Sequence, residues 1–121
     1  KPLLNAGMIF EAIVLMLNNI SANSVFYKKA LKLEGAVTFN QIAMKCVYEM
    51  FMNIISEKST GKKSKYRWLT PEVISTYYAQ SLCFITEGWI AQGMDDIEPK
   101  EMAEAYMYLI TRSMDDILSE L

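Results

Sequence analysis

Few of the residues that carry enzyme chemistry are present in this sequence, and none stands in a catalytic pattern. Histidine, the commonest general base and metal ligand, is absent. The pairs Asp95-Asp96 and Asp115-Asp116 fit solvated surface charge better than an acid/base couple or a metal site. Gly61-Lys62 lacks the upstream glycine of a phosphate-binding loop. We therefore expect no enzyme activity, no metal site and no cofactor.

The two cysteines are the remaining side chains with reactive chemistry. Cys46 and Cys83 lie far apart within helical patterns and form no metal-binding motif. Cysteines in such core-like surroundings indicate reduced, buried side chains of an intracellular protein. The expected location is therefore the cytoplasm.

The apolar side chains offer a different chemistry, the binding of a small molecule. Nine methionines and a 12% aromatic share are generous for this length, and methionine-rich interiors reshape around apolar guests. Such a pocket has apolar walls and few polar groups, here with the Tyr78 hydroxyl as a polar handle. The same residues equally describe a filled core. The residues expected to line the pocket are Phe10, Val14, Leu17, Phe26, Phe39, Ile42, Cys46, Met50, Tyr78 and Leu82.

These side chains must be positioned by helices, because no segment alternates long enough to predict a strand. Thr38 and Gln41 form a capping box that predicts the start of a central helix. Pro71 and Pro99 suit first helical positions, and Gly93 suits a helix end. The sequence therefore predicts an all-α, five-helix domain, with helices over Leu3–Asn19, Ser24–Lys32, Thr38 to about Glu57, Pro71–Gln92 and Pro99–Glu120.

Each of the last two expected helices has two adjacent apolar stripes, one more than a helix needs to pack on its own domain. Gly88 indicates that a partner packs against this helix. A glycine inside a helix costs about 1 kcal/mol relative to alanine, so it usually has a packing reason. We expect the two helices to form an antiparallel hairpin that makes a four-helix bundle in a homodimer. Alternatively, both helices are central in a monomer. The expected interface residues are Tyr77, Ser81, Phe84, Gly88, Ala103, Met107, Ile110 and Met114.

Length, charge and hydropathy exclude several other classes. A chain of 121 residues suits one domain. A net charge of −2 and a pI of about 5.1 argue against nucleic acid as a direct partner, although a short basic stretch lies between Glu57 and Trp68. The longest apolar run, Ala12–Leu17, is too short for a membrane span. The chain starts at Lys1 without an initiator methionine, which indicates a fragment.

Three motifs carry a family resemblance. They are Trp89-x-x-x-Gly93-Met94, the following Pro99-x-Glu101-Met102-Ala103, and the upstream Asn23-x-x-Phe26-Tyr27. With them, the chain resembles the C-terminal domain of TetR/AcrR-type transcriptional regulators, and within these the dihydroxyacetone-kinase regulator group.

The resemblance implies a single regulatory domain over residues 1–121 that dimerises through its last two helices and encloses an effector pocket. It also implies that DNA is bound only by an N-terminal helix-turn-helix head, which is absent from this chain. The expected partners are a second copy and a small apolar or amphipathic effector. A helical protein-interaction domain with a filled core is the alternative function, and a small helical enzyme or lipid carrier is a third.

Overall fold

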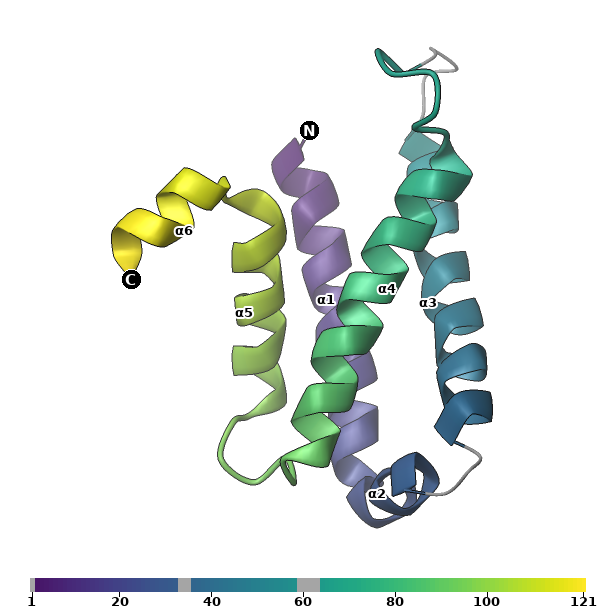
Figure 1. Ribbon diagram of the computed structural model, residues 1–121, viewed down its shortest axis with the longest axis vertical. Helices are drawn as coiled ribbons and strands as arrows, with labels where there is room; N and C mark the ends of the chain where they lie inside the picture. The colour runs from purple at the N-terminus through teal and green to yellow at the C-terminus, as the bar shows by residue number, and fades with distance from the viewer. Residues whose placement is uncertain (1, 33–35, 59–63) are drawn as a thin grey trace.

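Six α-helices and no strand make up the part of the chain that the computed structural model describes (Figure 1). It describes residues 2–32, 36–58 and 64–121, and the side chains of 7–32, 40–57 and 64–121. The all-α prediction is therefore confirmed for these residues. The helices are α1 (Pro2–Ala22), α2 (Ser24–Lys32), α3 (Ala36–Lys58), α4 (Pro71–Ala91), α5 (Pro99–Thr111) and α6 (Met114–Glu120).

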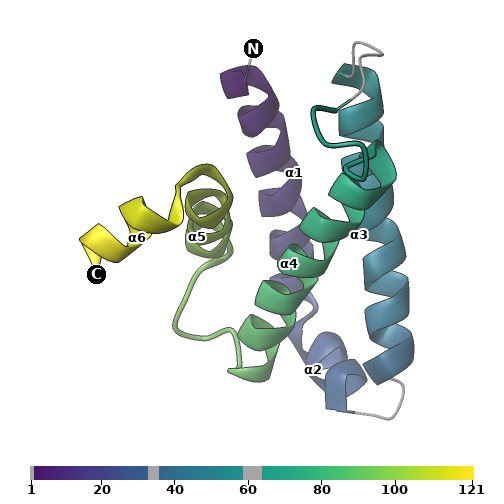
Figure 2. The ribbon, with the colours of Figure 1, turned by 45° about the horizontal axis from the view of Figure 1, so that its top comes forward.

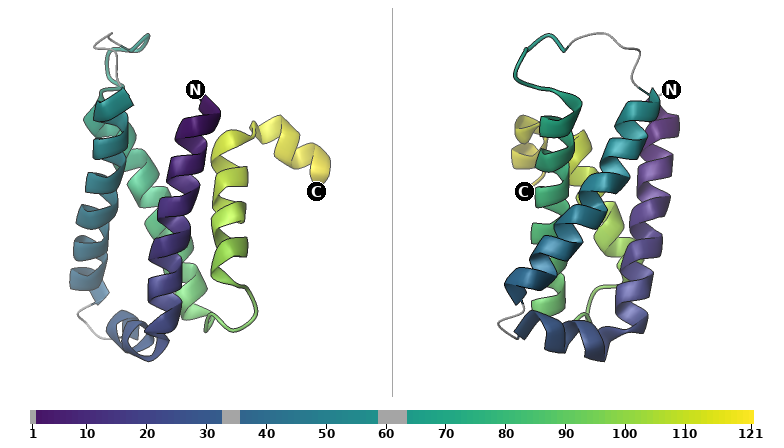
Figure 3. Two further views of the ribbon diagram at one scale, coloured as in Figure 1. Left: turned by 180° about the vertical axis from the view of Figure 1, so that it is seen from behind. Right: turned by 90° about the vertical axis from the view of Figure 1, so that its right-hand side faces the viewer.

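The long helices form two packed pairs, α3 with α4 and α1 with α5. Helix α4 crosses in front of α1 in Figure 1, and the reverse view in Figure 3 shows α1 in front. The short helix α2 lies across one end of the bundle and contacts α1, α3 and α4. Helix α4 is thus in the middle of the arrangement.

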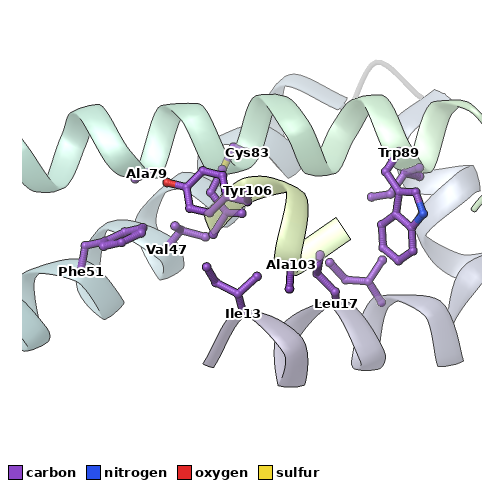
Figure 4. Packing of buried hydrophobic residues seen from close by; sticks show 12 residues of the cluster. Ile13, Leu17, Val47, Phe51, Ala79, Cys83, Trp89, Ala103 and Tyr106 are labelled. Carbon is purple, nitrogen blue, oxygen red and sulfur yellow. The ribbon is translucent and has the colours of Figure 1, made fainter. Parts of the chain in front are cut away.

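The core fills the space between α4 and the helices α1, α3 and α5. Figure 4 shows Tyr106 of α5 between α4 and the α1 side chains Ile13 and Leu17. Trp89 closes one end of the cluster, and its indole nitrogen donates a 2.9 Å hydrogen bond to the Ile97 carbonyl. This bond fixes the loop between α4 and α5 against the core. The buried apolar residues are Ile13, Leu17, Ile20, Val47, Phe51, Ala79, Leu82, Cys83, Trp89, Ile90, Ala103 and Tyr106.

The count of five helices is wrong for the described residues, because the last predicted helix is two helices. Arg112 is extended at φ −106° and ψ 150° and ends α5. Ser113 then caps α6, its Oγ accepting a 3.1 Å hydrogen bond from the Asp116 amide. Asp115 and Asp116 also favour the positive end of the new helix. As a result α6 turns away from the bundle (Figure 2).

The other predicted helix boundaries lie close to the observed ones. Helix α3 begins at Ala36, so Thr38 is inside the helix and not at its N-cap, a correction of two residues. Helix α4 begins as predicted, with Thr70 Oγ1 accepting from the Val73 amide at 3.2 Å. It ends at Ala91, and Gly93 follows with φ 102°.

The predicted α4–α5 hairpin is not confirmed as a packed pair. The two helices run in opposite directions (Figure 1), but their main packing partners are α3 and α1. One polar link joins them directly. The Tyr106 hydroxyl donates a 3.0 Å hydrogen bond to the Tyr78 carbonyl and lies 2.9 Å from Ser81 Oγ. Burial raises the pKa of Tyr106 to about 12, so the hydroxyl stays protonated as a donor at neutral pH.

Among the described residues, no single helix is both long and apolar enough to cross a bilayer. Only α1 from Gly7 together with α2, which meet at an 86° bend, have the combined length and composition to do so.

We predict that Tyr106→Phe destabilises the fold by about 1 kcal/mol, the net contribution of one buried hydrogen bond. The ring stays in place, and the Tyr78 carbonyl keeps its 2.8 Å bond from Ser81. Urea unfolding at fixed protein concentration measures the loss. Tyr66→Phe, at an exposed tyrosine, is the matched control, and equal stability of all three proteins would contradict the link.

Candidate functional site

A cavity of about 400 Å³ lies where α1, α2, α3 and α4 meet. This volume is within the usual range of small-molecule pockets. Its walls are mostly apolar, and each of the four helices contributes at least two side chains. They are Met16, Asn19, Ile20, Phe26, Tyr27, Ile42, Ala43, Cys46, Val47, Cys83, Thr86 and Glu87.

Helix α4 supplies the most polar wall of the cavity. Cys83, Thr86 and Glu87 are three and four residues apart and so share one face of the helix. The Thr86 side chain is 7% exposed, and its hydroxyl has no hydrogen-bond partner. A buried polar group without a partner costs about 1–3 kcal/mol. A ligand group that reached this hydroxyl would supply the missing hydrogen bond.

The Glu87 carboxylate is held in place from α3. Asn40 Nδ2 donates a hydrogen bond to Glu87 Oε2. Burial, followed by the negative charges of Glu87 and Cys46, raises the pKa of the Cys83 thiol from 9.0 to about 11. The negative charge of Glu87 therefore acts on Cys83, another side chain of the cavity wall.

Two aromatic rings from α2 also line the cavity. Phe26 and Tyr27 meet edge to face at 5.2 Å between centroids. Phe26, Ile42 and Cys46 are all exposed, unlike Cys83 and Val47 deeper in the wall. The cavity is therefore open to solvent on the side of α2 and α3.

Only some of the residues predicted for a pocket lie in the cavity. Phe26, Ile42 and Cys46 line the cavity. Leu17 and Leu82 are buried in the core, and Phe10, Val14 and Met50 pack against it. The Phe39 side chain lies outside the described residues.

Tyr78 lines a second hollow and not the cavity. Its ring stacks on Phe51 at 5.6 Å, which turns it towards the start of α4. This hollow, of about 740 Å³, is a shallow groove along α4 beside the exposed Trp68. Its lining residues are Trp68, Leu69, Glu72, Val73, Ile74, Thr76, Tyr77, Tyr78 and Gln80.

The sequence predicted three of the twelve cavity residues, Phe26, Ile42 and Cys46. It missed the polar residues Asn19, Thr86 and Glu87, because polar side chains do not stand out in an apolar pattern. It also missed six others, because residue type and spacing do not separate a cavity wall from a core: Met16, Ile20, Tyr27, Ala43, Val47 and Cys83. The signal that could have found Glu87 is its place four residues after Cys83 in an otherwise uncharged helix segment. Among the described residues, no group of three or more acidic or cysteine side chains is arranged to hold a metal ion.

Helix α4 also has an outward surface without any charge. We call Tyr77, Gln80, Phe84, Gly88 and Ala91 the outer stripe; all five are exposed and recur at helical spacing. Tyr77 is 67% and Phe84 79% exposed. A solvated helix face is normally polar or charged. A Cβ placed on Gly88 would meet nothing within 4 Å, so this chain's own packing gives no reason for the glycine.

The other predicted interface residues differ in exposure. Met114 is 76% exposed at the start of α6, whereas Met107 and Ile110 are half-buried against the core. Ser81 is bonded to Tyr106. Ala103 is fully buried in the core (Figure 4), so it offers no surface to a partner. Its small size instead suits close packing inside the chain.

We predict that the two cavity thiols react at very different rates. At pH 8 a pKa of about 11 leaves Cys83 with about 100-fold less thiolate than a pKa of 9.0, and burial slows access further. An aromatic disulfide reagent should therefore modify Cys46 fast and Cys83 slowly. Cys46→Ser should remove the fast phase and Cys83→Ser the slow one; two equal rates would contradict this geometry.

Comparison with protein families assigns the chain. A model described as the C-terminal region of transcriptional regulators matches residues 8–112, which include the cavity and the outer stripe. Neither curated proteins nor solved structures give a match. Because the family model spans most of the sequence, the chain belongs to the TetR-type transcriptional regulator C-terminal regions.

Proposed function

We propose that this chain, over residues 1–121, is the effector-sensing and dimerisation domain of a TetR-like regulator that acts in the cytoplasm. Regulators of this family typically act as dimers and bind DNA through an N-terminal domain. The C-terminal region is typically not an enzyme. A closer relation to the dihydroxyacetone-kinase regulator group is part of the proposal.

The cavity is the single observation that carries effector sensing. It combines apolar walls with few polar groups, which is the usual composition of a ligand site. An unfilled space of this size between four helices favours this function over an interaction domain with a filled core. A small apolar or amphipathic molecule suits these walls.

The outer stripe supports dimerisation. A second copy that covers Tyr77 and Phe84 would remove two large apolar side chains from water, at about 1.5–3 kcal/mol for each side chain fully buried. Gly88 would let two α4 helices approach closely. The proposed interface keeps Tyr77, Phe84, Gly88 and Met114, with Met107 and Ile110 at its edge. It no longer includes Ala103, which is buried, or Ser81, which is bonded to Tyr106.

Both proposed sites are on adjacent faces of the same helix. Cys83 and Glu87 face the cavity, whereas their neighbours Phe84 and Gly88 belong to the outer stripe. A ligand that shifts α4 would therefore change the dimer geometry directly. In a dimer this change would alter the distance between two DNA-binding heads and their fit to operator half-sites.

We predict that Ala43→Phe blocks the cavity. Ala43 is half-buried and lines it from α3, so a phenylalanine there occupies the ligand's space. Saturating n-octanol should raise the melting temperature of the wild-type chain by several degrees, since 100-fold excess over Kd stabilises by about 2.7 kcal/mol. The variant should show almost no shift. Ala105→Phe, on an exposed position of α5, should respond like wild type, and an equal response of Ala43→Phe would contradict the cavity as the site.

We predict that Phe84→Glu weakens the dimer at least about 100-fold, since a carboxylate facing the twin's apolar stripe costs several kcal/mol. Phe84 is exposed within the chain, so the fold itself should tolerate the change. Light scattering across a concentration series measures the dissociation constant. The control is Leu15→Glu, a similarly exposed apolar residue on α1. Wild-type affinity of Phe84→Glu would exclude the outer stripe as the interface.

A further inference from the structure

Among the described residues that line the cavity, a single side chain is charged, and its charge is negative. Among the described residues, no lysine or arginine lines the cavity, and Glu87 is its one carboxylate. With its pKa at about 11, the Cys83 thiol is neutral at neutral pH and cannot attract a cation itself. The walls therefore disfavour a carboxylate or phosphate group, because an anion would meet Glu87 without a compensating charge.

Glu87 has acceptor capacity left for a ligand. A carboxylate has two oxygens with about four acceptor sites, and Asn40 uses one of them at Oε2. The Thr86 hydroxyl is adjacent in sequence and has no partner. Together the two side chains can take a donor group with more than one N–H, as an ammonium has.

The aromatic rings from α2 also favour a positively charged ligand. Phe26 and Tyr27 both line the cavity, and the face of an aromatic ring attracts cations. Met16, Ile20 and Val47 provide apolar surface for the rest of the molecule. An acidic residue, a threonine, two aromatic residues and several apolar residues thus line one cavity.

We propose that the effector is an amphipathic cation, with an ammonium group at Glu87 and Thr86 and an apolar body against α1 and α3. This inference rests on the proposed effector cavity and names the chemical class of its ligand. It differs from a merely apolar guest in requiring the charge of Glu87.

Three probes of equal chain length separate the possibilities: n-octylammonium chloride, n-octanol and sodium octanoate. Their affinities for the whole chain are measured by titration calorimetry at constant salt and pH 7. Octylammonium should bind at least about tenfold tighter than octanoate, the factor that about 1.4 kcal/mol of a charge-assisted hydrogen bond gives. Octanol should lie between them.

Glu87→Gln should weaken octylammonium binding about tenfold and change octanol binding by less than about twofold, because only the charge is removed. Glu101→Gln, at an exposed acidic residue of α5 outside the cavity, should leave all three affinities unchanged. Thr86→Val removes the orphan hydroxyl at constant shape, so it should weaken octylammonium binding without lowering the stability of the free chain.

The outcomes separate the two proposals. Octanoate binding as tightly as octylammonium, or an unchanged preference in Glu87→Gln, overturns the cationic ligand. If octanol still binds and Ala43→Phe abolishes that binding, the effector cavity stands. If none of the three probes binds the wild-type chain, both proposals fail.

Discussion

Helix α4 is the constraint on which the rest of the structure depends, because each of its four sides has a different role. One side packs on α3, another receives Tyr106 of α5, and a third forms the polar wall of the cavity. The fourth side, the outer stripe, is exposed and uncharged. A surface helix normally turns a polar or charged face towards water, and an exposed face with no charge is what a helix covered by a partner would have.

The buried face of α4 is built for close approach. Ser75, Ala79 and Cys83 are four residues apart and all buried, and small side chains in this spacing let a neighbouring helix come near. Larger side chains of the core come from the facing helices, among them Phe51 and Val47 from α3 and Tyr106 from α5. The Ser75 hydroxyl has no partner in this packing, and nothing in the structure explains it.

The sequence predicted those parts of the fold that have strong local signals. Pro71, Thr70 and Gly93 marked α4 correctly because caps act within a few residues. The break at Ser113 carried the same kind of signal, a serine followed three residues later by an aspartate, but the apolar spacing of Met107, Ile110 and Met114 continues across it. Periodicity alone therefore predicted one helix where the backbone is extended at Arg112.

The candidate site was harder to predict because it depends on tertiary position. Large apolar residues such as Leu17 and Leu82 fit a pocket and a core equally well by type, and the structure buries both in the core. Phe26, Ile42 and Cys46 do line the cavity. Their residue types resemble those of the core, and only the position of α2 across the end of the bundle distinguishes them. Ala103 shows the same effect among the residues predicted for the interface, since a small residue gives no sign of which neighbour it faces.

The mass of the wild-type chain in solution tests the central idea most directly. Sedimentation equilibrium at micromolar concentration should give twice the 13.8 kDa of one chain, because we expect the uncharged side of α4 to be buried against a second copy of the chain. A mass of one chain, unchanged up to high concentration, would mean that Tyr77 and Phe84 stay in water, and the account of α4 as a helix shared between two copies would be wrong.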